Sequence, residues 1–156
     1  MESDGKENNI LSSDMITERL LDGEDKNKDP RLVSPLLLAF IGDSVYDLCI
    51  RTALVKRGNR QVQKVHAKAT DFVSARAQSE AAKRLKTCFT NEETEIFKRG
   101  RNAKFHTKAK NASTVEYKAA TGFEAVFGYL FLKGEHDRIL ELAALSVGDD
   151  PSALLK

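Results

Sequence analysis

The chain of 156 residues has no tryptophan, only three prolines and two cysteines, and no long apolar run. Two cysteines without a secretory signal are more often free thiols than a bridge, which argues against a disulfide-stabilised fold. A membrane-spanning helix needs about 18 consecutive apolar residues, and no segment approaches that length. The N-terminus also lacks the basic start and apolar block of a signal peptide. We therefore expect a cytoplasmic protein with no membrane partner.

The composition is that of a globular domain, with 41% apolar and 31% charged residues. The net charge is only +2, but the charges are unevenly distributed along the chain. Residues 1–30 carry nine acids and four bases, whereas residues 31–156 carry 21 bases and 14 acids. We expect residues 1–30 to form an acidic, flexible tail and residues 31–156 to form one folded domain.

Two segments contain bases and no acid. Residues 56–68 hold five bases, and residues 98–110 hold six. A solvated surface is the ordinary explanation of one such run. Two runs, in a chain that also places acids in apolar stretches, favour a polyanion as the partner.

Apolar residues recur at three- and four-residue steps, and no segment alternates as a β-strand does, so the pattern predicts an all-α fold. Ser34-Pro35 and Ser74 are helix-start signals, and capping boxes are predicted where Thr90 precedes Glu93 and Ser113 precedes Glu116. The expected helices cover about residues 34–56, 60–72, 74–86, 90–100, 113–134 and 137–145, with a short helix at 16–21 in the tail.

Two acids stand out, because each lies in an apolar helical stretch: Asp43 in FIGDSVYDL and Glu124 in ATGFEAVFGYLFL. An ionised carboxylate among packed apolar side chains is costly, so we expect both acids to be buried against a cation, a donor or water. Gly42 precedes Asp43, and Gly122 and Gly128 flank Glu124. Since glycine inside a helix costs about 1 kcal/mol relative to alanine, we expect close helix approach there. Such an approach brings the two carboxylates together, where they can hold a divalent cation such as Mg²⁺.

Asp47 lies one turn after Asp43, on the same helix face. It can support the site of Asp43 or form an ion pair with Arg51, four residues further on. We favour the pair with Arg51, because such helix pairs are common. For Asp43 or Glu124 alone, a hydrogen-bonded structural acid is the default explanation. Because both acids lie in similar apolar helical segments with a glycine nearby, a functional role of the pair is favoured.

The segment IGDSVYDL resembles the signature of the ribonuclease III family, in which a Gly-Asp-aliphatic pattern lies on a buried helix. TGFEAVFGYLFL resembles the second motif of that family. The segments VHAKATDFVSARAQ, RGRNAK and 117–129 are similar to one branch, Mini-ribonuclease III, and the resemblance covers about residues 34–142. The parent enzymes have two more acids, where this chain has Ala39 and Thr121. They also carry a C-terminal double-stranded-RNA-binding domain, for which the 24 residues after Leu132 are too few.

The resemblance implies that residues 31–156 form a helical catalytic domain, which dimerises with a second copy and cuts double-stranded RNA. It implies that Asp43 and Glu124 are catalytic and hold Mg²⁺, for which Mn²⁺ can substitute, and that a metal-activated water hydrolyses the phosphodiester. The expected substrate is the large-subunit (23S-type) precursor ribosomal RNA. Because RNA duplexes are read through shape, phosphates and 2′-hydroxyls, contacts are expected from Arg99, Arg101, Asn102, Lys104, Lys108 and Lys110.

Two alternatives remain open. A non-catalytic module that binds double-stranded RNA or the ribosome would keep the basic segment without needing the two acids. A helical phosphohydrolase acting on small molecules would use the basic segment to grip a nucleotide. His66 and Gln78 belong to the matching segments, and packing or hydrogen bonding between helices is the expected role of both.

Overall fold

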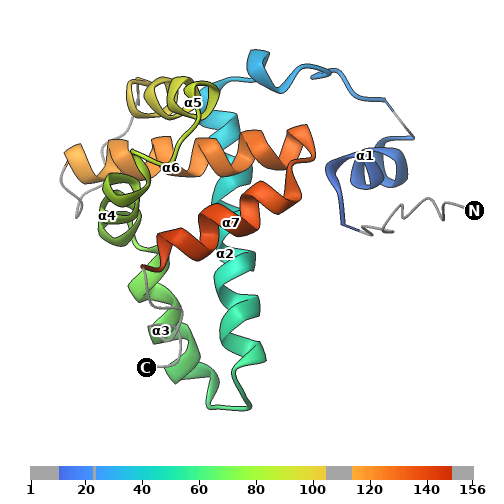
Figure 1. The fold of residues 1–156 in the computed structure, drawn as a ribbon. Coiled ribbons are helices and arrows are strands. Elements are labelled where there is room, and N and C mark those ends of the chain that lie inside the picture. The colour runs from blue at the N-terminus through green and yellow to red at the C-terminus, as the bar shows by residue number, and fades with distance from the viewer. Residues whose placement is uncertain (1–10, 23, 105–113, 149–156) are drawn as a thin grey trace, which may run out of the picture.

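Helices make up the regular structure of the residues that the computed structural model describes, which are 11–22, 24–104 and 114–148, and no strand occurs in these ranges. This result confirms the predicted all-α fold (Figure 1). The capping box predicted at Ser113 and Glu116 falls partly outside the described residues. The elements in chain order are α1 (Ser13–Leu21), a 3₁₀ helix η1 (Pro30–Leu32), α2 (Pro35–Lys56), α3 (Val62–Val73), α4 (Ala75–Leu85), α5 (Asn91–Arg101), α6 (Thr114–Lys133) and α7 (His136–Ser146).

Local signals define where several helices begin. Thr90 and Glu93 form the predicted capping box of α5: the Glu93 N–H donates to the Thr90 hydroxyl at 3.1 Å, and the Thr90 N–H donates to the Glu93 carboxylate at 3.0 Å. Ser74 caps α4 by accepting a backbone hydrogen bond at 3.2 Å. Ser34 and Pro35 take the predicted positions at the start of α2, but the Ser34 side chain makes no capping bond. The fixed φ of proline therefore defines this start.

The central helix of the fold is α6, which packs against α2, α4, α5 and α7. Figure 1 shows it running across α2, with α4 and α5 beside its N-terminal half and α7 folded back beside its C-terminal half. From residue 120 to residue 130, every α6 side chain except Glu124 is buried. Tyr46 of α2 meets Phe123 and Phe127 of α6, with ring centroids 4.8 and 5.1 Å apart. These aromatic contacts form the centre of the core.

The backbones of α2 and α6 touch where the helices cross. A Cβ atom added to Gly42 would lie 1.7 Å from the carbonyl oxygen of Glu124, and one added to Gly128 would lie 1.9 Å from the carbonyl oxygen of Leu38. Only glycine fits at these positions, because any larger residue would overlap backbone atoms of the facing helix. The close helix approach predicted from the glycines is thus confirmed.

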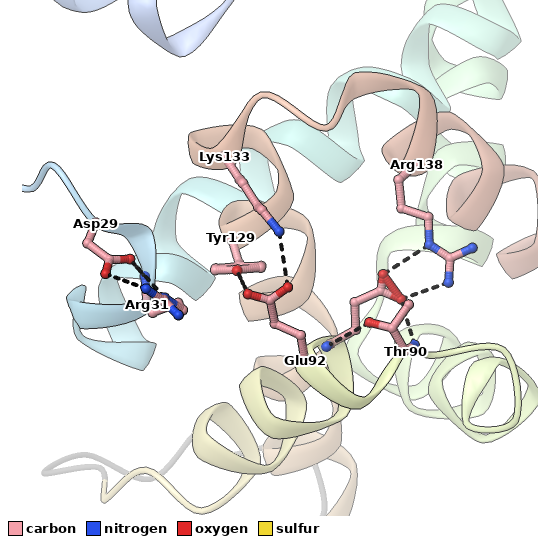
Figure 2. Close-up of polar contacts among 8 residues, drawn as sticks. Asp29, Arg31, Thr90, Glu92, Tyr129, Lys133 and Arg138 are labelled. Atoms are coloured by element: carbon pink, nitrogen blue, oxygen red, sulfur yellow. Dashed lines mark hydrogen bonds and ion pairs between the residues drawn. The ribbon is translucent and has the colours of Figure 1, made fainter.

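Polar contacts join the beginning of α5 to the end of α6 and to α7 (Figure 2). The Glu92 carboxylate accepts a hydrogen bond from the Tyr129 hydroxyl and, at 3.0 Å, from the Lys133 ammonium group, both on α6. The buried Glu93 carboxylate accepts two bonds, of 2.7 and 2.9 Å, from the Arg138 guanidinium of α7. These contacts fix the beginning of α5 near the end of α6, so the basic end of α5 lies beside the N-terminal half of α6.

Helix α1 lies inside the segment expected to be a tail, and it includes the short helix predicted at residues 16–21. The Ser13 hydroxyl donates to the carbonyl of Leu132 in α6 at 3.4 Å, so α1 contacts the end of α6. The domain boundary at residue 30 remains a prediction.

The two cysteines are free: Cys49 is half-buried and Cys88 is exposed. Within the described ranges, no helix combines the length and the apolar character that crossing a membrane requires.

Candidate active site

Asp43 of α2 and Glu124 of α6 lie together where the two helices cross. Gly42, next to Asp43 in the chain, contacts the backbone of Glu124, so the crossing itself places one acid beside the other. Burial raises the pKa of Glu124 to about 8, and the neighbouring Asp43 carboxylate adds to this rise. The structure therefore brings together the two acids that the sequence singles out.

The two acids differ in burial, since Glu124 is half-buried and Asp43 is exposed. The prediction that both are buried was wrong for Asp43. The physical reason lies on the same side of α2, where Phe40 is 77% exposed and Leu37 is 56% exposed. Residues of α1 and of the segment 25–33 line a depression together with Leu37 and Phe40, but they leave both side chains more than half exposed. The acid pair consequently opens to the surface, where a large ligand can reach it.

Gln78 of α4 is a third polar group beside the pair. Its side chain is 1% exposed, and its amide lowers the pKa of the nearby Glu124. The contact with Glu124 falls short of standard hydrogen-bond geometry, so neither the oxygen nor the nitrogen of the amide makes a full hydrogen bond among the described residues. Sequence reasoning assigned Gln78 to packing or to hydrogen bonding between helices. The available signal was its position in an otherwise apolar stripe of α4, with Ala81, Ala82 and Leu85 one and two turns later.

Asp47 forms the ion pair with Arg51 that the sequence favours. The Arg51 Nε donates to Asp47 Oδ2 at 2.8 Å. The other carboxylate oxygen of Asp47 is buried and has no partner in the described chain. Asp47 is thus held by Arg51 through one oxygen only.

The donors at this site suit a hard cation. Among the described residues, no group of three or more His, Cys, Asp and Glu side chains is gathered as a metal-binding set. Asp43, Glu124 and Gln78 nevertheless offer carboxylate and amide oxygens, which Mg²⁺ and Mn²⁺ prefer. The unpartnered amide of Gln78 leaves polar binding capacity unused at the pair. Few protein ligands suffice for Mg²⁺, which usually keeps several of its waters.

The basic residues predicted to bind RNA lie at the end of α5 and beyond it. Asn102 is the C-cap of α5, and Asn102 and Lys104 are exposed. The Arg101 Nε donates to the Asn102 amide oxygen at 3.3 Å. Lys108 and Lys110 lie outside the described residues.

Arg99 has a structural contact within the same group. Its guanidinium donates to the carbonyl of Arg31 at 2.8 Å and to the carbonyl of Val33 at 3.2 Å. These bonds tie α5 to η1 and to the start of α2. The side chain therefore positions the basic end of α5 in addition to carrying charge.

A shallow depression between α4, α5 and α6 adds cations that the sequence analysis missed. It has a volume of about 180 Å³, and Phe89 and Phe97 contribute to an apolar floor. Its lining includes four cationic side chains and no acid: Lys83, Lys86, Lys98 and Arg101. Lys83 and Lys86 lie outside the basic segment in sequence, and they come near it because α4 and α5 both pack against α6.

Known proteins resemble the chain in both sequence and structure. The Ribonuclease III domain family matches residues 36–135. Mini-ribonuclease 3 of Brevibacillus brevis is 43% identical over 76% of this chain and 89% of its own length. The Thermoanaerobacter sp. protein of the same name is 46% identical over 74% and 81%, and that of Clostridium tetani 45% over 80% and 84%.

A solved structure extends the likeness to the fold. The crystal structure of protein FN1578 from Fusobacterium nucleatum superposes with a TM-score of 0.67 at 27% identity, covering 75% of this chain and 93% of that one. The family match, the relatives and this fold agree with one another. The chain therefore belongs to the ribonuclease III family of endoribonucleases, in its Mini-ribonuclease III branch.

Proposed function

We propose that the protein hydrolyses phosphodiester bonds in double-stranded RNA with a divalent cation, Mg²⁺ or Mn²⁺ in its place, held by Asp43 and Glu124. The observation that carries the proposal is the pairing of these acids at the α2–α6 crossing, open to the surface on the Asp43 side. Their mutual repulsion and the burial of Glu124 would be relieved by a positive charge between them.

When bound, the cation would lower the pKa of a coordinated water and stabilise negative charge on the phosphate. Asp43 and Glu124 would hold the cation directly or through water, and neither side chain attacks the substrate. Asp43 is exposed, so the RNA backbone would reach the cation from this side. Glu124 lies in the buried middle of α6, so the packing of this helix would hold its carboxylate in a fixed position.

The basic side chains at the end of α5 and around the neighbouring depression would place the duplex over the acid pair. Gly100 of α5 is in contact with Gly122, two residues before Glu124, so the basic end of α5 begins close to the acids. Phosphate contacts are proposed for Lys83 and Lys86, and for the predicted set of Arg99, Arg101, Asn102, Lys104, Lys108 and Lys110. Such contacts release counterions, so binding should weaken steeply as salt rises.

Dimerisation would cover the open side of α2. Phe40, which is 77% exposed, lies one turn from Leu37, which is 56% exposed, and an exposed apolar patch of this kind marks an interface. We place Phe40 and Leu37 in a contact with a second copy of the chain, which would set two acid pairs on one duplex. Large-subunit precursor ribosomal RNA in the cytoplasm is the proposed substrate.

Cleavage of a long RNA duplex, with Mg²⁺ or with EDTA, tests the proposal. Asp43→Asn and Glu124→Gln keep the shape of each acid but remove its charge, and Asp137→Asn at an exposed position of α7 is the matched control. We expect discrete duplex products from the wild type and the control with Mg²⁺. Both site variants should bind the duplex without cutting it.

The alternatives give different results. Duplex binding by the wild type without cleavage under any divalent cation would leave the RNA- or ribosome-binding module. Cleavage of free nucleotides with no action on the duplex would select the small-molecule phosphohydrolase.

A further inference from the structure

Gln78 has features that a purely structural residue does not explain. It is 1% exposed, yet both polar atoms of its amide lack a hydrogen-bond partner within the described chain. Burying an amide without partners is unfavourable, and an apolar side chain of the same length would fill the space at no such cost. Buried polar groups left unpaired in this way deserve a functional explanation.

The position of Gln78 supplies that explanation. It lies on α4 close to the Glu124 carboxyl group, which in turn interacts with Asp43 of α2. Of the buried side chains in the described residues, only Asp47 and Gln78 leave polar atoms without a partner. Asp47 is anchored to Arg51 through its second oxygen, whereas neither amide atom of Gln78 makes a full hydrogen bond, although the amide lies close enough to Glu124 to lower the pKa of that carboxyl. Gln78 is thus a buried group beside the acid pair whose hydrogen-bonding capacity the described chain leaves unsatisfied.

We infer that Gln78 is a third protein group of the cation site, with its amide oxygen available to the cation or to one of its waters. Its amide nitrogen would then donate to Glu124 and hold that carboxylate in place. The inference rests on the proposed function, because it assumes that Asp43 and Glu124 bind a divalent cation. It adds that the site draws ligands from three helices, α2, α4 and α6. An amide oxygen is a ligand type that Mg²⁺ and Mn²⁺ accept.

The experiment measures Mn²⁺ binding to the full chain without RNA, by calorimetric titration, together with the thermal unfolding midpoint. Gln78→Met removes the amide but keeps an unbranched side chain of the same length. We expect it to raise the Kd for Mn²⁺ about tenfold, as loss of a supporting group does at metal sites, while Tm is unchanged or higher. Gln78→Glu keeps an oxygen at the same reach and should restore binding.

Ser146→Ala is the matched control for loss of a buried polar group. The Ser146 hydroxyl pairs with the Tyr46 hydroxyl at 3.0 Å and lies on α7, a helix that supplies none of the proposed cation ligands. This variant should show the opposite pattern, a lower Tm with unchanged Mn²⁺ affinity. If Gln78→Met behaves like Ser146→Ala, Gln78 is a packing residue and the inference is wrong.

A further arm separates this inference from the function on which it rests. Asp43→Asn should abolish Mn²⁺ binding if the acid pair is the cation site. If it does, and Gln78→Met still binds like the wild type, only the role of Gln78 is refuted. If Asp43→Asn binds Mn²⁺ normally, the acid pair is not the site and both proposals are refuted.

Discussion

Replacing Gly42 with alanine should force α2 away from α6 and disturb the acid pair. The new Cβ atom would lie 1.7 Å from the carbonyl oxygen of Glu124 and 2.7 Å from the backbone nitrogen of Gly128, where real Cβ contacts are essentially never below 3.0 Å. Both obstacles are backbone atoms, so no side chain can rotate to make room. The helices must separate by more than about 1 Å, and a misplacement of that size at a catalytic group can reduce the rate about 100-fold.

The stability cost follows from two opposing terms. Overpacking costs about 1–3 kcal/mol, and an obstacle made of backbone places Gly42→Ala at the upper end, about 3 kcal/mol. Alanine recovers about 1 kcal/mol of helix propensity relative to glycine. We expect a net loss of about 2 kcal/mol. For a chain of this length, that loss lowers Tm by about 4–8 °C.

Thermal unfolding and Mn²⁺ titration of Gly42→Ala check both parts of this prediction. Thr52→Ala is the control, because Thr52 is exposed on the same helix and its replacement adds helix propensity without any overlap. The control should keep or slightly raise Tm and should bind Mn²⁺ like the wild type. A Gly42→Ala protein with wild-type Tm and wild-type Mn²⁺ affinity would refute the tight crossing of α2 and α6.

Four further predictions concern other parts of the molecule. Arg138→Ala should lose about 3 kcal/mol in urea unfolding, because the Glu93 carboxylate is left buried without its partner. Burial opposes ionisation of Glu93, but the hydrogen bonds from Arg138 and the capping threonine outweigh it and hold its pKa below 4.5. The stability that this gives is present above pH 4.5 and falls as the pH drops below it, so Glu93→Gln should lose less stability on acidification than the wild type. Arg101→Ala and Lys104→Ala should each reduce the slope of log K against log salt for duplex binding by about 1, and unchanged slopes would remove them from the interface. Phe40→Asp should sediment as a monomer, whereas a persistent dimer would show that this face of α2 is not the contact.

The features that the sequence predicts correctly are those with local causes. The capping box of Thr90 and Glu93 and the cap at Ser74 involve only neighbouring residues, so their patterns specify the starts of α5 and α4. The contact of α2 with α6 is not local. Gly42 and Gly128 nevertheless predict it, because glycine inside a helix lowers helix stability and is therefore expected where two helices approach closely. The same close approach places Asp43 beside Glu124.

The features that the sequence does not predict depend on what covers each side chain. The apolar neighbours of Asp43 indicated burial, but Phe40 is itself uncovered, so Asp43 is exposed. Lys83 and Lys86 come near Lys98 because α4 and α5 both pack against α6. The hydrophobic periodicity of the sequence does not predict that these cations lie close together, because their proximity depends on the angles between helices that are separate in sequence.

The tight crossing also explains why a third ligand would come from α4. Ala39, one turn before Asp43, and Thr121, one turn before Glu124, are buried at 5% and 6% exposure, so large charged side chains do not fit these places without strain. The Thr121 hydroxyl donates to the carbonyl of Tyr117 at 3.0 Å, which uses its proton within α6. With α2 and α6 each supplying one acid, α4 is the adjacent helix with an unused polar group facing the pair. A cation held by all three helices would bind the native state and not the unfolded chain, so Mn²⁺ should raise Tm in the wild type. The increase should be smaller in Gln78→Met at the same Mn²⁺ concentration, and an equal increase in both proteins would place the cation away from α4.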